Sequence, residues 1–248
     1  IYWMKECLLN IGIKKLLSEG YENIVCIDAD IIFKSDTWTE DILNGLKKNN
    51  VVQIFETCYE QTNSSEYIHG NSSVSLAKKQ NNILGGLLSR QGEVGYGYAY
   101  KSEVLSQCLL YDKAILGSGD FANIIGCVYQ NSQKHLIVND RFFCSASKDF
   151  ISDYISWAEK MSRASEHRVG FCAGEIYVLP HGNRLDRNYI GRESIIKKYK
   201  FKPTKDLLMQ LNGIYELSTK LINMKLDIKK YFYSRDEDKN ILDNTKKS

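Results

Sequence analysis

The feature that most constrains the fold is a short apolar run that ends abruptly in two carboxylates. Ile24–Ile27 leads directly into Asp28-Ala29-Asp30. A continuous β-rich run is typical of a central strand buried on both faces, and ligands bind at the carboxyl edge of open α/β sheets. Two carboxylates about 6–7 Å apart along an extended chain repel each other unless a cation neutralises them. We therefore expect Asp28 and Asp30 to bind a divalent metal; the alternative is a turn with solvated acids.

The strands and helices around this run predict an open α/β sheet with covering helices. The spacing of Leu9, Ile13, Leu16 and Leu17 predicts a helix over residues 3–17. A capping box of Thr37 and Glu40 would open the next helix, which carries Trp38, Ile42 and Leu46 on one face. Further strands are expected at 51–55, 96–100 and 169–179. Further helices are expected at 102–110, 120–130, from an N-cap at Asp149, at 192–200 and at 205–233, and a long polar loop over 57–82.

Composition excludes some functional classes. The chain has 248 residues and a formal net charge of +3, which is too small to indicate a nucleic-acid partner. No apolar run is long enough to span a membrane. Seven cysteines are scattered, so we expect reduced, mostly buried thiols and a cytoplasmic protein. We expect residues 1–234 to form one domain and residues 235–248 to form a polar tail.

A histidine and several arginines follow the strand expected to end at Leu179. His181 is a suitable ligand for a manganese-like ion beside carboxylates, although a lone histidine is more often structural. Arg184, Arg187 and Arg192 could bind phosphate oxygens in bidentate fashion. The alternative is that these arginines form the solvated start of a helix.

The segment Gly117-Ser118-Gly119-Asp120 carries the third signal. Its glycines allow a backbone to approach a ligand closely. Asp120 would lie at a helix N-terminus, where an N-cap is its commonest role. The sharper hypothesis is a general base that takes the proton of an attacking hydroxyl.

Four motifs in this order resemble glycosyltransferases of the GT-A fold. The resemblance is to bacterial and large-virus enzymes, and more distantly to animal β-galactosyltransferases, and it covers roughly residues 2–215. The motifs are Tyr2-Trp3-Met4-Lys5-Glu6-Cys7-Leu8-Leu9-Asn10, Ile27-Asp28-Ala29-Asp30, Gly95–Lys101 with Ile115–Asp120, and His181-Gly182 with Arg187, Tyr189 and Arg192.

The resemblance implies roles for individual residues. Asp30 and Asp28 would hold the metal, with manganese favoured over magnesium, and His181 would complete its shell. Asp120 would be the base of an inverting reaction. Donor binding would fall to Lys5, Asn10, Asp28, Tyr98, Ala99, Gly119, Arg187 and Arg192, with Lys5 facing the nucleotide and the arginines screening the leaving diphosphate.

The expected architecture is therefore a GT-A-like, Rossmann-like open mixed sheet flanked by helices. Only 27 residues precede Asp28, so the first strands of such a sheet are expected to be missing. The expected activity is transfer of a sugar from a nucleotide-diphosphate sugar, with UDP favoured, to a glycan or other hydroxyl acceptor. Two alternatives remain, namely a haloacid-dehalogenase-like phosphatase with Asp28 as nucleophile and a non-catalytic sugar-binding module, since fold alone does not determine function.

Overall fold

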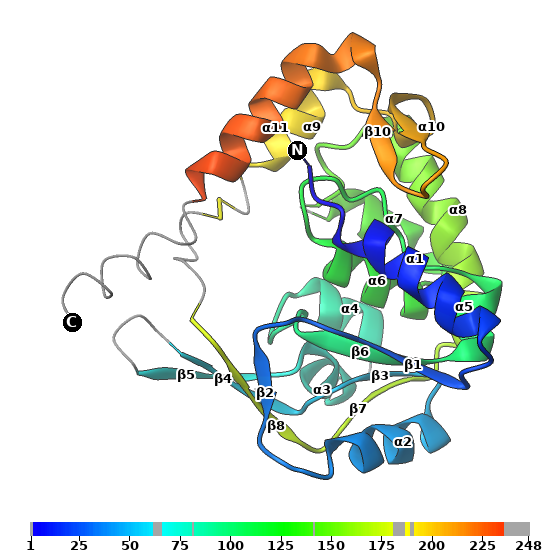
Figure 1. Ribbon diagram of the computed structural model, residues 1–248, viewed down its shortest axis with the longest axis vertical. Helices are drawn as coiled ribbons and strands as arrows, with labels where there is room; N and C mark the ends of the chain where they lie inside the picture. Colours follow the sequence, from blue (N-terminus) through cyan, green and yellow to red (C-terminus); the bar gives the residue numbers. More distant parts are fainter. Residues whose placement is uncertain are drawn as a thin grey trace.

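The computed structural model shows an α/β protein with open mixed sheets flanked by helices, as the sequence predicts (Figure 1). It describes residues 2–61, 66–80, 82–140, 142–180, 187–188 and 191–235. The strands are β1 (Asn23–Ile27), β2 (Ile31–Phe33), β3 (Val51–Gln53), β4 (Thr57–Gln61), β5 (Tyr67–Asn71), β6 (Gly97–Lys101), β7 (Val169–Phe171), β8 (Glu175–Val178), β9 (Leu207–Met209) and β10 (Tyr215–Leu217). The α-helices are α1 (Lys5–Ser18), α2 (Trp38–Lys48), α3 (Ser73–Lys78), α4 (Ile83–Leu88), α5 (Ser102–Gln107), α6 (Gly119–Val128), α7 (Lys134–Asn139), α8 (Lys148–Ser165), α9 (Glu193–Tyr199), α10 (Pro203–Asp206) and α11 (Ile222–Ser234). Two 3₁₀ turns, η1 (Asn131–Gln133) and η2 (Thr219–Leu221), complete the described elements.

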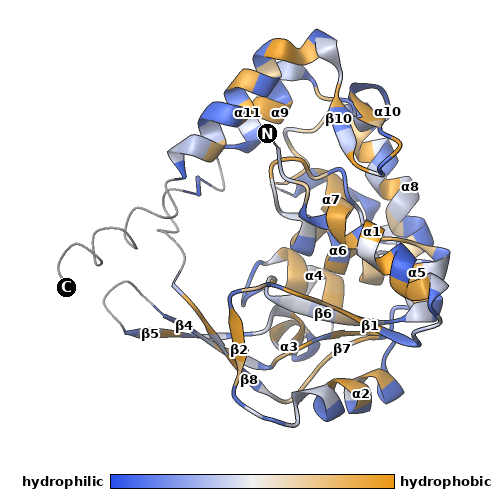
Figure 2. Cartoon of the chain, in the orientation of Figure 1, coloured by the Kyte–Doolittle hydropathy of each residue, from blue (hydrophilic) through white to orange (hydrophobic). Residues whose placement is uncertain are grey.

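The first sheet has the strand order β1-β6-β3-β7 and is covered on both faces. Its strand β3 runs parallel to β7 and antiparallel to β6. Val51 and Val52 are both fully buried but belong to different core clusters, one on each side of the sheet. Ile42 and Leu46 of α2 pack on the Val52 side, while Figure 2 shows α2 exposing polar residues elsewhere. Strand β3 is therefore buried on both faces, including the side chain of Gln53.

Strand β1 departs from the expectation of a central strand. It pairs antiparallel with β6 and, among the described residues, is the outermost strand of its sheet. Of its five residues only Ile24 is fully buried. Helix α1 packs beside the strand and supplies apolar side chains along it, which explains why an apolar run is compatible with an edge position.

The second sheet has the order β2-β8-β4-β5 and corrects two predictions. Residues 57–82 are not a long loop, because they contain β4, β5 and α3. Cys58 is buried while its neighbours are partly exposed, so a half-buried strand is hidden in a polar composition. The strand expected over residues 169–179 is two strands, because β7 joins the first sheet and β8 the second.

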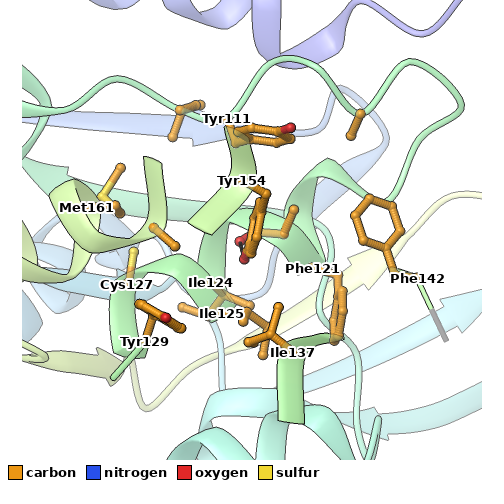
Figure 3. Close-up of a cluster of buried hydrophobic side chains, with 14 of the residues drawn as sticks. Tyr111, Phe121, Ile124, Ile125, Cys127, Tyr129, Ile137, Phe142, Tyr154 and Met161 are labelled. Atoms are coloured by element: carbon orange, nitrogen blue, oxygen red, sulfur yellow. Dashed lines mark hydrogen bonds between the residues drawn. The ribbon is translucent and has the colours of Figure 1, made fainter. Parts of the chain in front are cut away.

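Helix α6 forms the centre of the larger core. Phe121, Ile124, Ile125 and Cys127 from this helix pack against Tyr154 and Met161 of α8 and against neighbouring aromatic rings (Figure 3). The Tyr154 hydroxyl donates a 2.8 Å hydrogen bond to the Ala122 carbonyl oxygen. Close packing of this kind leaves little freedom for the N-terminal turn of α6, which carries Asp120.

Two predictions about helix caps are wrong. Thr37 precedes α2 but forms no side-chain cap, because its hydroxyl hydrogen bonds with Ser35 instead. Ser147, not Asp149, caps α8, with its hydroxyl accepting from the Phe150 amide at 3.1 Å. Asp149 lies in the first turn and accepts from Thr204.

The helix expected over residues 205–233 is broken by the hairpin of β9 and β10 before α11 begins. Gly213 has φ +80° at the turn of this hairpin, a conformation that favours glycine. Five of the seven cysteines are buried, Cys26 is partly buried and Cys144 is exposed, and all are free thiols. Within the described part of the chain, no helix has both the length and the apolar character needed to cross a membrane.

Candidate active site

Lys5 brings together the carboxylates of two distant segments. Its Nζ lies 2.6 Å from Asp28 Oδ1 and 3.0 Å from Asp120 Oδ1. Lys5 is the first residue of α1, Asp28 follows the last residue of β1, and Asp120 lies in the first turn of α6. The three side chains are 22–30% exposed, so the cluster is partly screened from water but open to a ligand.

The loop before α6 aims Asp120 at this cluster. Gly117 has φ +100° and Ser118, the residue preceding the helix, has φ +68°. The left-handed conformation is unusual for serine, and the Ser118 hydroxyl is held by the guanidinium of Arg192. Ser118 is the N-cap residue, so the alternative that Asp120 caps the helix is wrong. Asp120 lies inside the first turn, where the helix dipole favours a carboxylate.

Charge and burial oppose each other at this cluster. Burial lowers the pKa of Lys5, but the carboxylates of Asp120 and Asp28 outweigh it and raise the pKa above its ordinary value. Burial raises the pKa of Asp120, the charge of Lys5 lowers it and the charge of Asp28 raises it again, with a net upward shift. A carboxylate held at a raised pKa is a stronger base than a solvated one, which suits proton removal from a hydroxyl.

Glu6 is a residue of this site that the sequence analysis missed. It is 3% exposed, and its carboxylate packs against Gly119, where an added Cβ would meet Oε1 at 2.0 Å. Oε1 has no hydrogen-bond partner among the residues that the structure describes. Burial, reinforced by the negative charge of Asp120, raises the pKa of Glu6 to about 8. Its position seven residues before Ile13, on the buried side of α1, is the sequence signal that could have revealed it.

Asp30 lies beside the end of the second sheet. Its carbonyl oxygen accepts a 2.8 Å hydrogen bond from the amide of Leu179, just beyond β8. Burial and the charge of Asp28 raise the pKa of Asp30, while the positive charges of Arg187 and Lys5 lower it. The two carboxylates thus repel each other in the folded chain, as the D-x-D spacing predicts.

These residues suit a divalent metal by their chemistry. Asp28 and Asp30 supply the hard oxygen ligands that manganese and magnesium favour, and the ammonium group of Lys5 already occupies a cation position beside Asp28. Among the described residues, no group of three or more His, Cys, Asp or Glu side chains is arranged to hold a metal. The predicted third ligand, His181, lies outside the described residues, as do Arg184 and Tyr189.

The two arginines predicted to bind the donor have different surroundings. The charge of Arg187 acts on Asp30, and its carbonyl oxygen accepts a 2.9 Å hydrogen bond from the Tyr231 hydroxyl. Arg192 is 4% exposed and contacts Ser118, Glu193 and Tyr231. Arg192 therefore ties the loop before Asp120 to α9 and α11, which is a positioning contact.

Of the other predicted donor-binding residues, two lie at the Lys5 cluster and two have packing roles. Gly119 lies against Glu6, and Tyr98 lines a cavity of about 20 Å³ together with Lys5, Glu6 and Asp120. Asn10 instead fixes the backbone of Leu110 through hydrogen bonds of 2.9 and 3.0 Å. Ala99 is fully buried against the α2 side of the sheet. The structure brings the first two residues to the cluster and leaves the last two in the packing around it.

A groove of about 450 Å³ lies between α1 and β1 and reaches Asp28. Lys5, Asp28 and Ala29 line this end. The rest of the groove is apolar, with side chains from Leu8, Leu9, Ile13, Leu16, Ile24, Val25 and Ile27. Its volume falls within the range of about 300–1,000 Å³ that small-molecule sites usually occupy.

Comparison with known proteins adds no relative to this picture. No protein-family model matches the chain, and searches of curated proteins and of solved structures found no match. The functional argument therefore depends on the geometry and chemistry of the site.

Proposed function

We propose that this chain is a metal-dependent, inverting glycosyltransferase with a GT-A-like fold. Its donor would be a nucleotide-diphosphate sugar, with UDP favoured by the resemblance, and its acceptor a hydroxyl group of a glycan or other molecule. The observation that carries the proposal is the convergence of Asp28 and Asp120 on Lys5 at 2.6 and 3.0 Å. Asp28 and Asp120 are 92 positions apart and belong to two different motifs of the resemblance. Both contact the ammonium group of Lys5, which belongs to a third motif.

Asp120 supplies the base in this proposal. The acceptor hydroxyl gives its proton to the Asp120 carboxylate while its oxygen forms a bond to the anomeric carbon. The bond from that carbon to the diphosphate oxygen breaks, and the nucleoside diphosphate leaves with the electron pair. Attack opposite to the leaving group inverts the anomeric configuration. The upward shift in the pKa of Asp120 favours proton uptake at this atom.

Asp28 and Asp30, with His181 outside the described residues, would hold a manganese or magnesium ion. That ion supplies Lewis-acid stabilisation of the diphosphate leaving group. Lys5 contributes a positive charge between the metal-binding carboxylates and the base. The apolar groove that begins at Lys5 and Asp28 offers room for the nucleoside.

Calorimetry of nucleotide-diphosphate sugars, with manganese and with chelator, tests the proposal. We expect binding of at least one donor that requires manganese, and loss of that binding in Asp30→Ala. Asp36→Asn, an exposed carboxylate outside the cluster, is the matched control and should bind like the parent. Donor binding that neither chelator nor Asp30→Ala changes would exclude the metal role.

Turnover is the second measurement, with release of the nucleoside diphosphate followed in the presence of hydroxyl acceptors. Donor binding without any transfer or hydrolysis would favour the non-catalytic sugar-binding alternative. Release of phosphate from simple phosphoesters, with no donor binding, would favour the phosphatase alternative.

A further inference from the structure

A row of side chains crosses the solvent face of the second sheet. The strand register aligns Ile32, Tyr177, Tyr59 and His69 across β2, β8, β4 and β5. Tyr67 joins them from β5, and we call these five residues the aromatic face. Ile32 is 51% and Tyr67 52% exposed, whereas Cys58, Ile176 and Val178 on the opposite side of the same strands are buried in the core.

The rings of the aromatic face contact one another. Tyr59 and Tyr177 stack with centroids 5.2 Å apart and an angle of 24° between their planes. Tyr67 meets Tyr177 edge to face at 5.5 Å, and His69 meets Tyr59 in the same manner at 5.6 Å. Mutual packing restricts the rotamers of these side chains. They would therefore lose little conformational entropy when a ligand stacks against them.

Hydrogen-bonding groups border the rings at one end. Thr57 and Glu175 lie two residues before Tyr59 and Tyr177 on the same strands, and therefore on the same face. They line a hollow of about 430 Å³ together with Lys34, Ser35 and Glu56. The Lys34 ammonium donates to Glu175 at 2.7 Å. Stacking rings beside hydroxyl, carboxylate and ammonium groups suit a ligand with both C–H faces and hydroxyls.

The charge of this region selects among such ligands. The hollow is lined by two carboxylates, those of Glu56 and Glu175, and by one ammonium group, that of Lys34, so its net charge is negative. An anionic ligand such as a phosphorylated sugar would be repelled. A neutral pyranose offers polarised C–H groups to the electron-rich ring faces and hydroxyls to the polar border. The chemistry of the face therefore matches a neutral carbohydrate.

The aromatic face is continuous with the candidate active site. Ile32 follows Asp30 by two residues, about 7 Å along a strand, and Tyr177 is its partner on β8. The ladder continues to Asp30, whose carbonyl oxygen accepts from Leu179. A carbohydrate on the aromatic face would extend toward the carboxylate cluster.

We propose that the aromatic face binds a neutral oligosaccharide and that this oligosaccharide is the acceptor of the transfer reaction. Its role as acceptor rests on the proposed function, whereas its binding to the face does not. The rings hold sugar units distant from the reacting hydroxyl, and the hollow beside Thr57 and Glu175 binds further hydroxyls.

Calorimetry and saturation-transfer NMR test binding with the full chain and a panel of neutral oligosaccharides, namely chitotetraose, cellotetraose, maltotetraose, xylotetraose and lacto-N-tetraose. We expect at least one of them to bind in the absence of manganese and donor. Tyr177→Ala and Tyr67→Ala should weaken binding about tenfold or more, the loss typical of a stacked ring. Tyr177→Phe keeps the ring and should bind within about twofold of the parent.

Tyr21→Ala is the matched control, because Tyr21 is 54% exposed and lies outside the aromatic face. Circular dichroism of each variant distinguishes lost binding from lost folding. No binding by any panel member at about 10 mM, or binding that both face variants leave unchanged, overturns the proposal. A dimer detected by sedimentation that Tyr67→Ala disperses also overturns it, because the face would then be an interface between two copies.

The same variants separate this proposal from the proposed function. Asp30→Ala should lose donor binding and keep oligosaccharide binding, and Tyr177→Ala should do the reverse. Donor binding without oligosaccharide binding refutes the acceptor face alone. Oligosaccharide binding without any donor binding leaves the face intact and refutes the glycosyltransferase.

Discussion

Replacing Glu6 with glutamine should make the free energy of unfolding less sensitive to alkaline pH. The pKa of Glu6 is raised from 4.5 to about 8, mainly by burial and then by the charge of Asp120. Between these values the folded chain keeps a proton on Glu6 that the unfolded chain has released. Stability therefore falls as pH rises from about 4.5 to about 8, and Glu6 adds no further loss above that.

The size of the effect follows from the shift. One pKa unit corresponds to about 1.4 kcal/mol, so ionising Glu6 in the folded chain costs up to about 5 kcal/mol. The pKa of about 8 already includes the opposing effect of the nearby Lys5 ammonium, which lowers it. We expect Glu6→Gln to be about 2–5 kcal/mol more stable than the parent at pH 9 and equal to it near pH 5.

Urea unfolding followed by circular dichroism, from pH 5 to pH 9, measures this difference. Other buried carboxyls with raised pKa values, such as Asp112, contribute equally to both proteins and cancel. Glu22→Gln, an exposed substitution of the same chemistry, should track the parent at every pH. Parallel curves for Glu6→Gln and the parent would refute the reasoning, because Glu6 would then be ionised in the folded chain at no cost.

Three further predictions follow from individual contacts. Asp120→Asn should lower the transfer rate about 10²–10⁴-fold and change donor affinity little, as calorimetry and product release would show; a parent-like rate would mean that the base lies elsewhere. Gly126→Ala should destabilise by about 1–3 kcal/mol, because its Cβ would come within 2.2 Å of the Trp157 ring. Gly12→Ala, with nothing within 4 Å of its Cβ, should stabilise α1 by up to about 1 kcal/mol, and equal melting curves for these two variants would contradict the packing argument. Arg192→Met should cost about 3–5 kcal/mol in urea unfolding, because it removes the buried guanidinium that contacts Glu193, Ser118 and Tyr231, and a loss below about 1 kcal/mol would show that these contacts are not essential.

Local signals in the sequence were enough to locate the main elements. Apolar spacing predicted α1 close to its observed bounds, the helix expected to open at Thr37 begins at Trp38, and the run before Asp28 is indeed a strand. Such patterns reflect the period of a single element against one surface, which a sequence states directly. The carboxylates of Asp28 and Asp120 were correctly expected at the ends of a strand and a helix.

Features that depend on distant partners escaped prediction. Thr37 is a local exception, because it hydrogen bonds with Ser35, two residues before it, instead of capping its helix. Residues 57–82 form strands because β8, more than 100 positions later, pairs with β4. The ion pairs of Lys5 and the burial of Glu6 against Gly119 likewise join segments far apart in the chain. No pattern within either segment alone specifies such pairs.

The charges at the site indicate what a diphosphate would require in order to bind there. Asp28, Asp30 and Asp120 contribute three negative charges, against one positive charge each from Lys5 and Arg187, which leaves a net charge of −1. If Glu6 were ionised, the net charge would be −2. Burial keeps Glu6 protonated and so holds the net negative charge at half that value. A diphosphate adds at least two further negative charges, which such a cluster would repel. A divalent cation held by Asp28 and Asp30, as proposed, would offset this repulsion. The raised pKa of Glu6, which burial causes and Asp120 reinforces, and the proposed metal would both limit the negative charge around the proposed base.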